Sequence, residues 1–134
     1  MRWPWDKGSQ PGDADGSGEG QSPHGLDVAS ALGLLTRGAV VIDVRTGKEY
    51  VRGHMPGARL VNPKELAADP IGAIWGDDPL AETDRPVIVV STTGVRASSA
   101  AAQLRKAGHD AWSLTGGLSA WLADGQVLIP GPSR

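Results

Sequence analysis

Residues 91–96, with the sequence STTGVR, place hydroxyl groups, a glycine and an arginine in one short segment. The segment follows the apolar run VIVV and precedes a stretch with helical spacing, so we expect a loop beyond the carboxyl end of a strand. Open parallel sheets bind ligands at such loops. Backbone N–H groups at the start of the following helix, and the positive end of its dipole, favour an anion. Gly94 allows close approach of the backbone, and Arg96 can present a fork of donors to an oxyanion.

The loop also has a simpler interpretation as an ordinary strand-to-helix turn. In that case Gly94 only permits the bend and Arg96 only solvates the helix start, and a lone glycine-containing loop is a weak signal. An arginine at a helix N-terminus is electrostatically unfavourable, however, and calls for an anion or a carboxylate nearby. We therefore favour an anion site. Its candidate substrate-binding residues are Thr92, Thr93, Gly94, Val95 and Arg96.

The strands that position this loop are indicated by apolar runs. Continuous runs at 39–44 and 87–90 are typical of strands that are covered on both faces of a parallel sheet. Shorter strands are expected at 58–62 and 110–114.

Helical patterns separate these strands. The expected helices lie at 26–37, 46–52, 63–68, 96–107 and 118–124. In the first helix, one apolar face is expected to hold Leu26, Ala29, Leu32 or Gly33, and Leu35, with Asp27 available at the helix start and Gly38 as the C-terminal stop. Residues 69–86 are rich in Gly, Pro and Asp, and we expect an irregular connection with at most a helical turn. Strands alternating with helices predict an α/β fold, a small parallel sheet flanked by helices on both faces.

The 134 residues leave room for one domain of ordinary size. We expect it to span residues 26–129, with a C-terminal tail at 130–134. Residues 1–25 are rich in Gly, Ser and Asp and nearly free of aliphatic residues, which is typical of a disordered tail. Trp3, Pro4 and Trp5 interrupt this tail. We interpret them as mobile, the alternative being a contact with a partner or with the protein's own surface.

Composition argues against several classes of protein. The chain has no cysteine, which rules out disulfides, thiolate metal sites and a thiol nucleophile. The 13 basic and 15 acidic residues give a net charge of -2 with no long run of either sign, so neither nucleic acid nor an anionic membrane is an expected partner. No secretory signal and no span of roughly 20 apolar residues is apparent, so we expect a cytoplasmic protein. The histidines lack metal-ligand spacing, so no metal is expected, and we expect no cofactor and a monomer.

Two longer motifs carry a family resemblance. VIDVRTGKEYVRGHMPGARLVN, at 41–62, and LTGGLSAWLADG, at 114–125, resemble the N-terminal and C-terminal signatures of the rhodanese homology domain. The matching residues are Asp43, Val44, Arg45, Glu49, Tyr50, Gly53, His54, Pro56, Gly57, Ala58 and Asn62 in the first, and Gly116, Gly117, Trp121 and Gly125 in the second. The resemblance covers about 26–125 and implies a rhodanese-like three-layer sandwich with the activity of a sulfurtransferase.

The loop itself aligns with the C-x-x-G-x-R loop found in many members of that family. Gly94 and Arg96 match, and Ser91 stands where the nucleophilic cysteine is expected. The resemblance implies that this cysteine takes a sulfane sulfur from a small anionic donor such as thiosulfate, becomes a persulfide, and passes the sulfur to a thiophilic acceptor. It makes Ser91 and Arg96 the catalytic positions. Thr92 and Val95 differ from the basic and polar residues often found there.

Serine does not replace cysteine in this chemistry. A hydroxyl is a much weaker acid than a thiol and cannot form the S–S bond of a persulfide, so we predict that the chain as written is inactive as a sulfurtransferase. A serine hydrolase is disfavoured because Val89 and Val90 precede Ser91, so the G-x-S-x-G elbow is absent. Two interpretations stay open. One is a sulfurtransferase domain whose cysteine has been replaced by serine, and the other is a naturally cysteine-less module that binds an anion or a partner.

Several polar and aromatic residues have structural interpretations. Asp43 and Arg45, at the end of a buried strand, are expected to pair and to fix the neighbouring loops. His54 is expected to make structural hydrogen bonds. Trp75 lies in the irregular connection, where it either packs over the site or anchors the segment.

Overall fold

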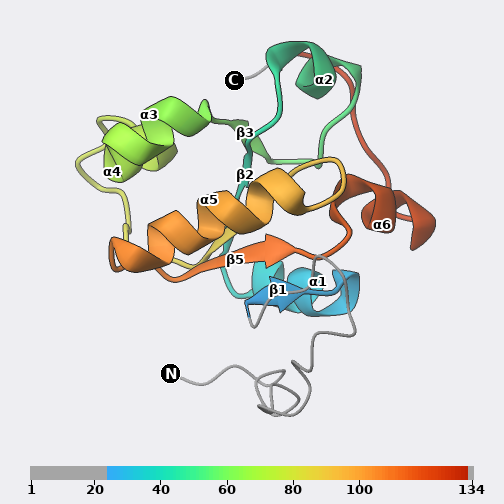
Figure 1. Cartoon of the computed structure of the whole chain (residues 1–134), viewed down its shortest axis with the longest axis horizontal. Coiled ribbons are helices and arrows are strands. Elements are labelled where there is room, and N and C mark those ends of the chain that lie inside the picture. The colour runs from blue at the N-terminus through green and yellow to red at the C-terminus, as the bar shows by residue number, and fades with distance from the viewer. Residues whose placement is uncertain (1–23, 133–134) are drawn as a thin grey trace.

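The computed structural model describes residues 24–132, which form a parallel sheet with helices packed on it (Figure 1). The sheet has five strands in the order β1-β5-β4-β2-β3, and every neighbouring pair is parallel. The strands are β1 (Gly25–Leu26), β2 (Val40–Asp43), β3 (Arg59–Leu60), β4 (Val87–Val90) and β5 (Ala111–Leu114). The helices are α1 (Val28–Thr36), α2 (Gly47–Arg52), α3 (Pro63–Ala68), α4 (Pro70–Trp75), α5 (Val95–Lys106) and α6 (Gly117–Ala123). The predicted α/β fold with a small parallel sheet is confirmed.

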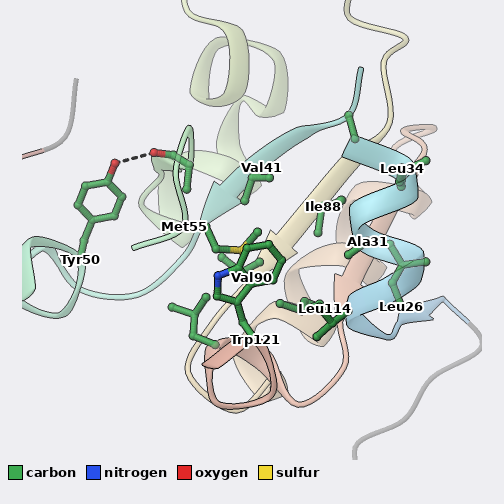
Figure 2. Close-up of a cluster of buried hydrophobic side chains, with 14 residues drawn as sticks. Leu26, Ala31, Leu34, Val41, Tyr50, Met55, Ile88, Val90, Leu114 and Trp121 are labelled. Carbon is green, nitrogen blue, oxygen red and sulfur yellow. Dashed lines mark hydrogen bonds between the residues drawn. The ribbon is translucent and has the colours of Figure 1, made fainter. Parts of the chain in front are cut away.

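Helices cover both faces of the sheet because the central strands are apolar on both sides. In β4, Ile88 and Val90 face one core cluster, which also holds buried residues of α1, α2 and α6 (Figure 2). Val87 and Val89 face the other cluster, with buried residues of α3, α4 and α5. All of these β4 residues are fully buried, as expected for a parallel strand between two helical layers.

The first helix differs from its prediction in the face that it buries. Val28, Ala31 and Leu34 are the buried residues of α1, whereas Ala29 is exposed. Leu26 is buried too, but it lies in β1, a two-residue edge strand that pairs with β5 and was not predicted. The predicted face was wrong at Ala29 and at Leu26, which precedes the N-cap Asp27 and so lies outside the helix. Leu32 and Leu35 are partly buried against the same cluster as Leu34, as predicted.

The connection before β4 contains a helix that the sequence analysis underestimated. α4 spans six residues, with the Asp69 side chain accepting from the Gly72 N–H and Pro70 in the first turn. An aspartate followed by a proline is a regular helix start, so the signal was present. Trp75 ends α4 and is buried in the second core cluster, where it anchors the segment.

The loop after β4 lies between two central strands whose following connections lead toward opposite edges of the sheet. From β2 the chain runs through α2 to β3 on one side, and from β4 it runs through α5 to β5 on the other. Ligands of open α/β sheets bind in the crevice beyond the carboxyl ends at such a point. The N–H of Val44 donates to the carbonyl oxygen of Val90 at 3.1 Å, so the two strand ends stay paired up to this crevice.

The predicted N-terminal tail lies almost wholly outside the described residues, and so does the end of the C-terminal one. The boundary at residue 129 stays a prediction, although the N–H of Gly131 donates to the Val51 carbonyl oxygen at 3.0 Å. Among residues 24–132, no helix is long and apolar enough to cross a membrane.

Candidate functional site

Ser91 is the residue directly after β4, and it is only 1 % exposed. Its Oγ accepts hydrogen bonds from the N–H groups of Gly94, at 3.1 Å, and Ala97, at 3.2 Å. Gly94 is the N-cap of α5 and Ala97 lies in the first turn of that helix. The hydroxyl therefore sits where the helix start directs its donors. A more acidic group at this position would be stabilised as an anion.

The loop rests on the corner between β5 and α6. The N–H of Leu118 donates to the Ser91 carbonyl oxygen at 2.9 Å, and the N–H of Ser119 donates to that of Thr92 at 3.1 Å. A trans peptide directs its carbonyl and its N–H in opposite directions. The N–H groups of Thr92 and Thr93, which share these peptides, therefore face away from α6.

Two glycines allow these backbones to approach so closely. A Cβ on Gly117 would lie 2.3 Å from the Ser91 carbonyl oxygen and 2.5 Å from that of Thr92. A Cβ on Gly94 would lie 3.1 Å from the Leu114 carbonyl oxygen. Both glycines also have positive φ, +60° at Gly117 and +97° at Gly94, a conformation that other residues rarely adopt. Gly94 is indicated by the loop motif, whereas Gly117 belongs to a different turn and its part in the loop is not visible in that motif.

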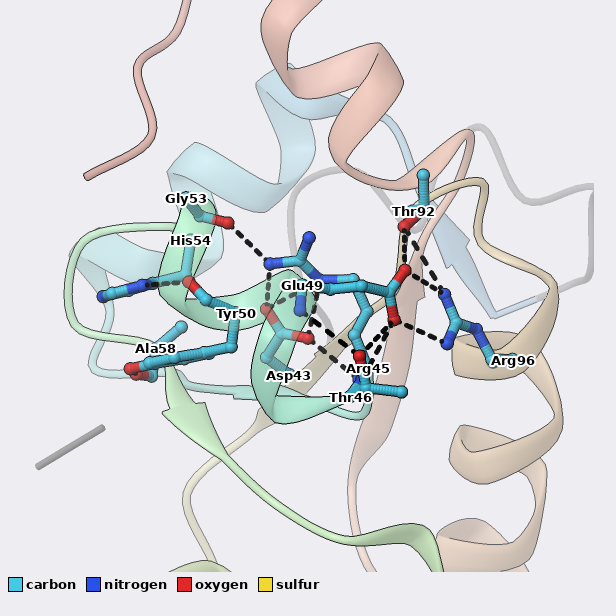
Figure 3. A network of polar contacts seen from close by, with 10 residues as sticks. All are labelled: Asp43, Arg45, Thr46, Glu49, Tyr50, Gly53, His54, Ala58, Thr92 and Arg96. Atoms are coloured by element: carbon cyan, nitrogen blue, oxygen red, sulfur yellow. Dashed lines mark hydrogen bonds and ion pairs between the residues drawn. The ribbon is translucent and has the colours of Figure 1, made fainter. Parts of the chain in front are cut away.

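The guanidinium of Arg96 is bound by Glu49 of α2 (Figure 3). Nη1 donates to Oε1 at 3.1 Å and Nη2 donates to Oε2 at 3.2 Å. The hydroxyl of Thr92 lies between them, 3.3 Å from Glu49 Oε2 and 3.4 Å from Arg96 Nη2. The sequence predicted an anion or a carboxylate beside Arg96, and the structure supplies a carboxylate. The sequence indicates Glu49 only as part of the 41–62 motif, not as the partner of Arg96.

Glu49 is held in place by its own helix. It forms a capping box with Thr46, whose N–H and hydroxyl both donate to Glu49 Oε1, at 3.0 Å and 3.1 Å. The Glu49 N–H donates back to Thr46 Oγ1 at 3.2 Å. The hydrogen bonds from Arg96 and then from the Thr46 backbone lower the pKa of Glu49 from 4.5 to about 2. The same contact raises the pKa of Arg96. The carboxylate is therefore ionised at neutral pH.

Replacing Arg96 by glutamine is expected to move the pKa of Glu49 from about 2 back toward 4.5, since it removes the largest cause of the shift. Carboxyl chemical shifts followed through an acid titration measure this midpoint. The folded-state pKa lies below the unfolded value, so the pair's contribution to stability is complete above about pH 4.5 and is lost as the pH falls toward 2. An unchanged Glu49 midpoint in the variant would show that Arg96 does not cause the shift.

Asp43 and Arg45 form the predicted buried pair beneath this surface. Arg45 Nε donates to Asp43 Oδ1 at 3.0 Å, and Arg45 Nη2 donates to Asp43 Oδ2 at 2.9 Å and to the Gly53 carbonyl oxygen at 2.7 Å. The pair ties the end of β2 to the end of α2. His54 is also structural, since its Nδ1 lies 2.9 Å from the Tyr50 carbonyl oxygen and the two rings stack.

A comparison with known protein families matches residues 27–124 to the rhodanese-like domain. The chain belongs to this family. The resemblance inferred from the motifs is therefore confirmed, and the Ser91 loop is the β4–α5 loop of a rhodanese-like domain.

Relatives of this rhodanese-like domain include proteins named for thiosulfate chemistry. It is 40% identical over 92 residues to the thiosulfate sulfurtransferase GlpE of Pseudomonas fluorescens, covering 68% of this chain and 77% of that protein. A crystal structure of thiosulfate sulfurtransferase from Pseudomonas aeruginosa matches with a TM-score of 0.67 and 26% identity, over 83% of this chain and 21% of that one. The rhodanese-related protein of Thermoplasma volcanium matches with a TM-score of 0.65 at 20% identity, over 79% and 97% of the two chains. This last likeness shows the fold alone.

The remaining loop residues of the rhodanese-like domain lie at its surface. Thr93 is exposed, and Val95 is 67% exposed at the first position of α5. The Thr93 hydroxyl makes no hydrogen bond within the described part of the chain, so it is available to a ligand, whereas the Val95 side chain has no polar group and Val95 can bind an anion only through its backbone. No group of His, Cys, Asp and Glu in residues 24–132 has the arrangement of a metal site.

Proposed function

We propose that this chain is a rhodanese-like sulfurtransferase domain in which sulfur transfer is disabled at Ser91 and the loop still binds small anions of the thiosulfate class. The proposal rests on one observation. An alcohol, buried and bound by the N–H groups of Gly94 and Ala97, stands at the start of a loop that otherwise keeps its glycine and its arginine.

The missing step follows from the chemistry of the nucleophile. In transfer from thiosulfate, a thiolate attacks the outer sulfur, the S–S bond of thiosulfate breaks, and sulfite leaves with the bonding electron pair. A cyanide ion then takes the sulfur as thiocyanate and the thiolate is restored. Ser91 cannot take part in this cycle, because its hydroxyl stays protonated at neutral pH. A persulfide also needs a sulfur atom on the side chain, and serine has an oxygen there.

Anion binding does not need the thiolate. The first N–H groups of a helix have no partner within that helix, and here Val95 and Arg96 begin α5. The N–H groups of Thr92 and Thr93 face away from α6, because the carbonyl groups of the same peptides accept hydrogen bonds from the start of that helix. Together with the dipole of a 12-residue helix, these groups favour a small oxyanion. The expected cytoplasmic location and monomeric state stay predictions.

Ser91→Cys tests the proposal directly. We expect the unaltered chain to give no thiocyanate from thiosulfate and cyanide, and the variant to give sustained turnover and a trapped form heavier by one sulfur atom. Ser99→Cys, on an exposed position of α5, is the matched control and should show neither, since its thiol lies outside the loop.

Turnover by the unaltered chain would refute the proposal. An inactive but folded Ser91→Cys protein would refute the sulfurtransferase site and favour the other interpretation, a module whose loop only binds an anion or a partner. Circular dichroism separates that outcome from loss of fold.

A further inference from the structure

Arg96, the cation that should attract an anion to this loop, is already occupied. Both terminal nitrogens of its guanidinium donate to the Glu49 carboxylate, and Thr92 Oγ1 contacts both partners (Figure 3). An anion approaching the loop therefore meets a paired, net-neutral unit with a carboxylate at its edge.

The carboxylate keeps its place even though the pair is partly exposed. The side chain of Arg96 is 45% exposed and that of Glu49 is 33% exposed, so dissolved ions reach both. A surface ion pair of this kind is ordinarily weak, because two long side chains must be ordered to form it. Here the Thr46 capping box orders the Glu49 side chain independently of Arg96. Glu49 thus stays beside the loop whether or not Arg96 holds it.

We propose that Glu49 is the residue that determines which anions the loop accepts. Its carboxylate acts as an internal counter-ion of Arg96 and repels an external anion in proportion to that anion's charge. A dianion such as sulfate or thiosulfate therefore loses more affinity to this repulsion than a monoanion does, so the loop binds the thiosulfate class less tightly than it would without Glu49. This inference rests on the proposed anion-binding function of the loop and assigns its charge selectivity to one side chain.

Glu49→Gln isolates the charge. Glutamine at this position of a helix can keep the reciprocal hydrogen bond of the capping box, so the variant removes the negative charge without removing the cap. Sulfate and nitrate are titrated into each protein at constant ionic strength while the amide signals of residues 92–97 are followed. We expect the variant to bind sulfate at least about tenfold more tightly, with a gain for nitrate near the square root of that factor.

Two further variants serve as controls for the change in charge. Glu65→Gln, at an exposed position on α3, makes the same change in net charge outside the loop and should leave both affinities unchanged. Combining Glu49→Gln with Arg96→Gln removes both charges, and sulfate affinity should return to near that of the unaltered chain.

The possible results distinguish failure of the role of Glu49 from failure of the proposed anion-binding function. Equal sulfate affinity in the unaltered and Glu49→Gln proteins would overturn the role of Glu49 and leave the anion loop standing. The same gain in sulfate affinity from Glu65→Gln would also overturn the role of Glu49, because removing any negative charge would then be enough to raise the affinity. Absence of sulfate and nitrate binding in every variant would instead overturn the proposed anion-binding function.

Discussion

Arg45→Met is expected to lower the free energy of unfolding by about 3–5 kcal/mol, the range for breaking a buried ion pair from one side. Asp43 has no exposed surface, and the Arg45 side chain donates three hydrogen bonds to its carboxylate. Removing the guanidinium leaves a buried carboxylate without its counter-ion. It also takes a donor from the Gly53 carbonyl oxygen. Urea unfolding followed by circular dichroism measures the loss.

Arg52→Met is the matched control for this prediction. Arg52 is an exposed residue in the last turn of α2, and its replacement should change stability by less than about 0.5 kcal/mol. Adding Asp43→Asn to Arg45→Met removes the unpaired charge and should recover about 1 kcal/mol or more. Equal losses from Arg45→Met and Arg52→Met would mean that the buried pair contributes nothing specific to the stability of the fold.

Gly117→Ala is expected to displace the β4–α5 loop and to destabilise the protein by about 2–5 kcal/mol. Its new Cβ would lie 2.3 Å, 2.5 Å and 2.7 Å from backbone atoms of Ser91, Thr92 and Gly94, which cannot rotate away as a side chain would. Crowding of this kind costs about 1–3 kcal/mol, and alanine at φ +60° adds about 1–2 kcal/mol. The amide signals of residues 91–97 should shift, because Leu118 and Ser119 lose the hydrogen-bond geometry that holds the loop.

Gly125→Ala separates the two causes. Gly125 has φ +88° with nothing within 4 Å of its added Cβ, so this variant carries the cost of the positive φ alone. We expect a loss of about 1–2 kcal/mol and unmoved loop signals. If both alanine variants behave alike, the contact between the loop and the β5–α6 corner is not what positions Ser91.

The fold followed from the sequence because its main determinants are local. The continuous apolar runs of β2 and β4 indicated strands covered on both faces, and the alternation of strands with helices indicated a parallel sheet. The errors also have local causes. Leu26 was assigned to a helix although Asp27 is the N-cap, and α4 was underestimated although Asp69 and Pro70 mark its start.

Only part of the site could be predicted from the sequence, because some of its residues come from separate segments of the chain. Ser91, Gly94 and Arg96 share one loop, and their spacing was sufficient to find them. Glu49 is 47 positions from Arg96, and Gly117 belongs to another turn. Both reach the loop through the order of strands in the sheet, which places β2 and β5 beside β4, and no periodicity in the sequence states that order.

The capping box of α2 has a consequence for local unfolding. Glu49 completes the start of α2 and also pairs with Arg96, so fraying of the first turn of α2 takes the carboxylate from Arg96 while Leu118 and Ser119 still hold the β4–α5 loop. That first turn then opens as a local unit under native conditions. An anion that binds the loop and draws Arg96 away from Glu49 would therefore change the rate of amide exchange at Thr46, whose N–H donates to the Glu49 carboxylate.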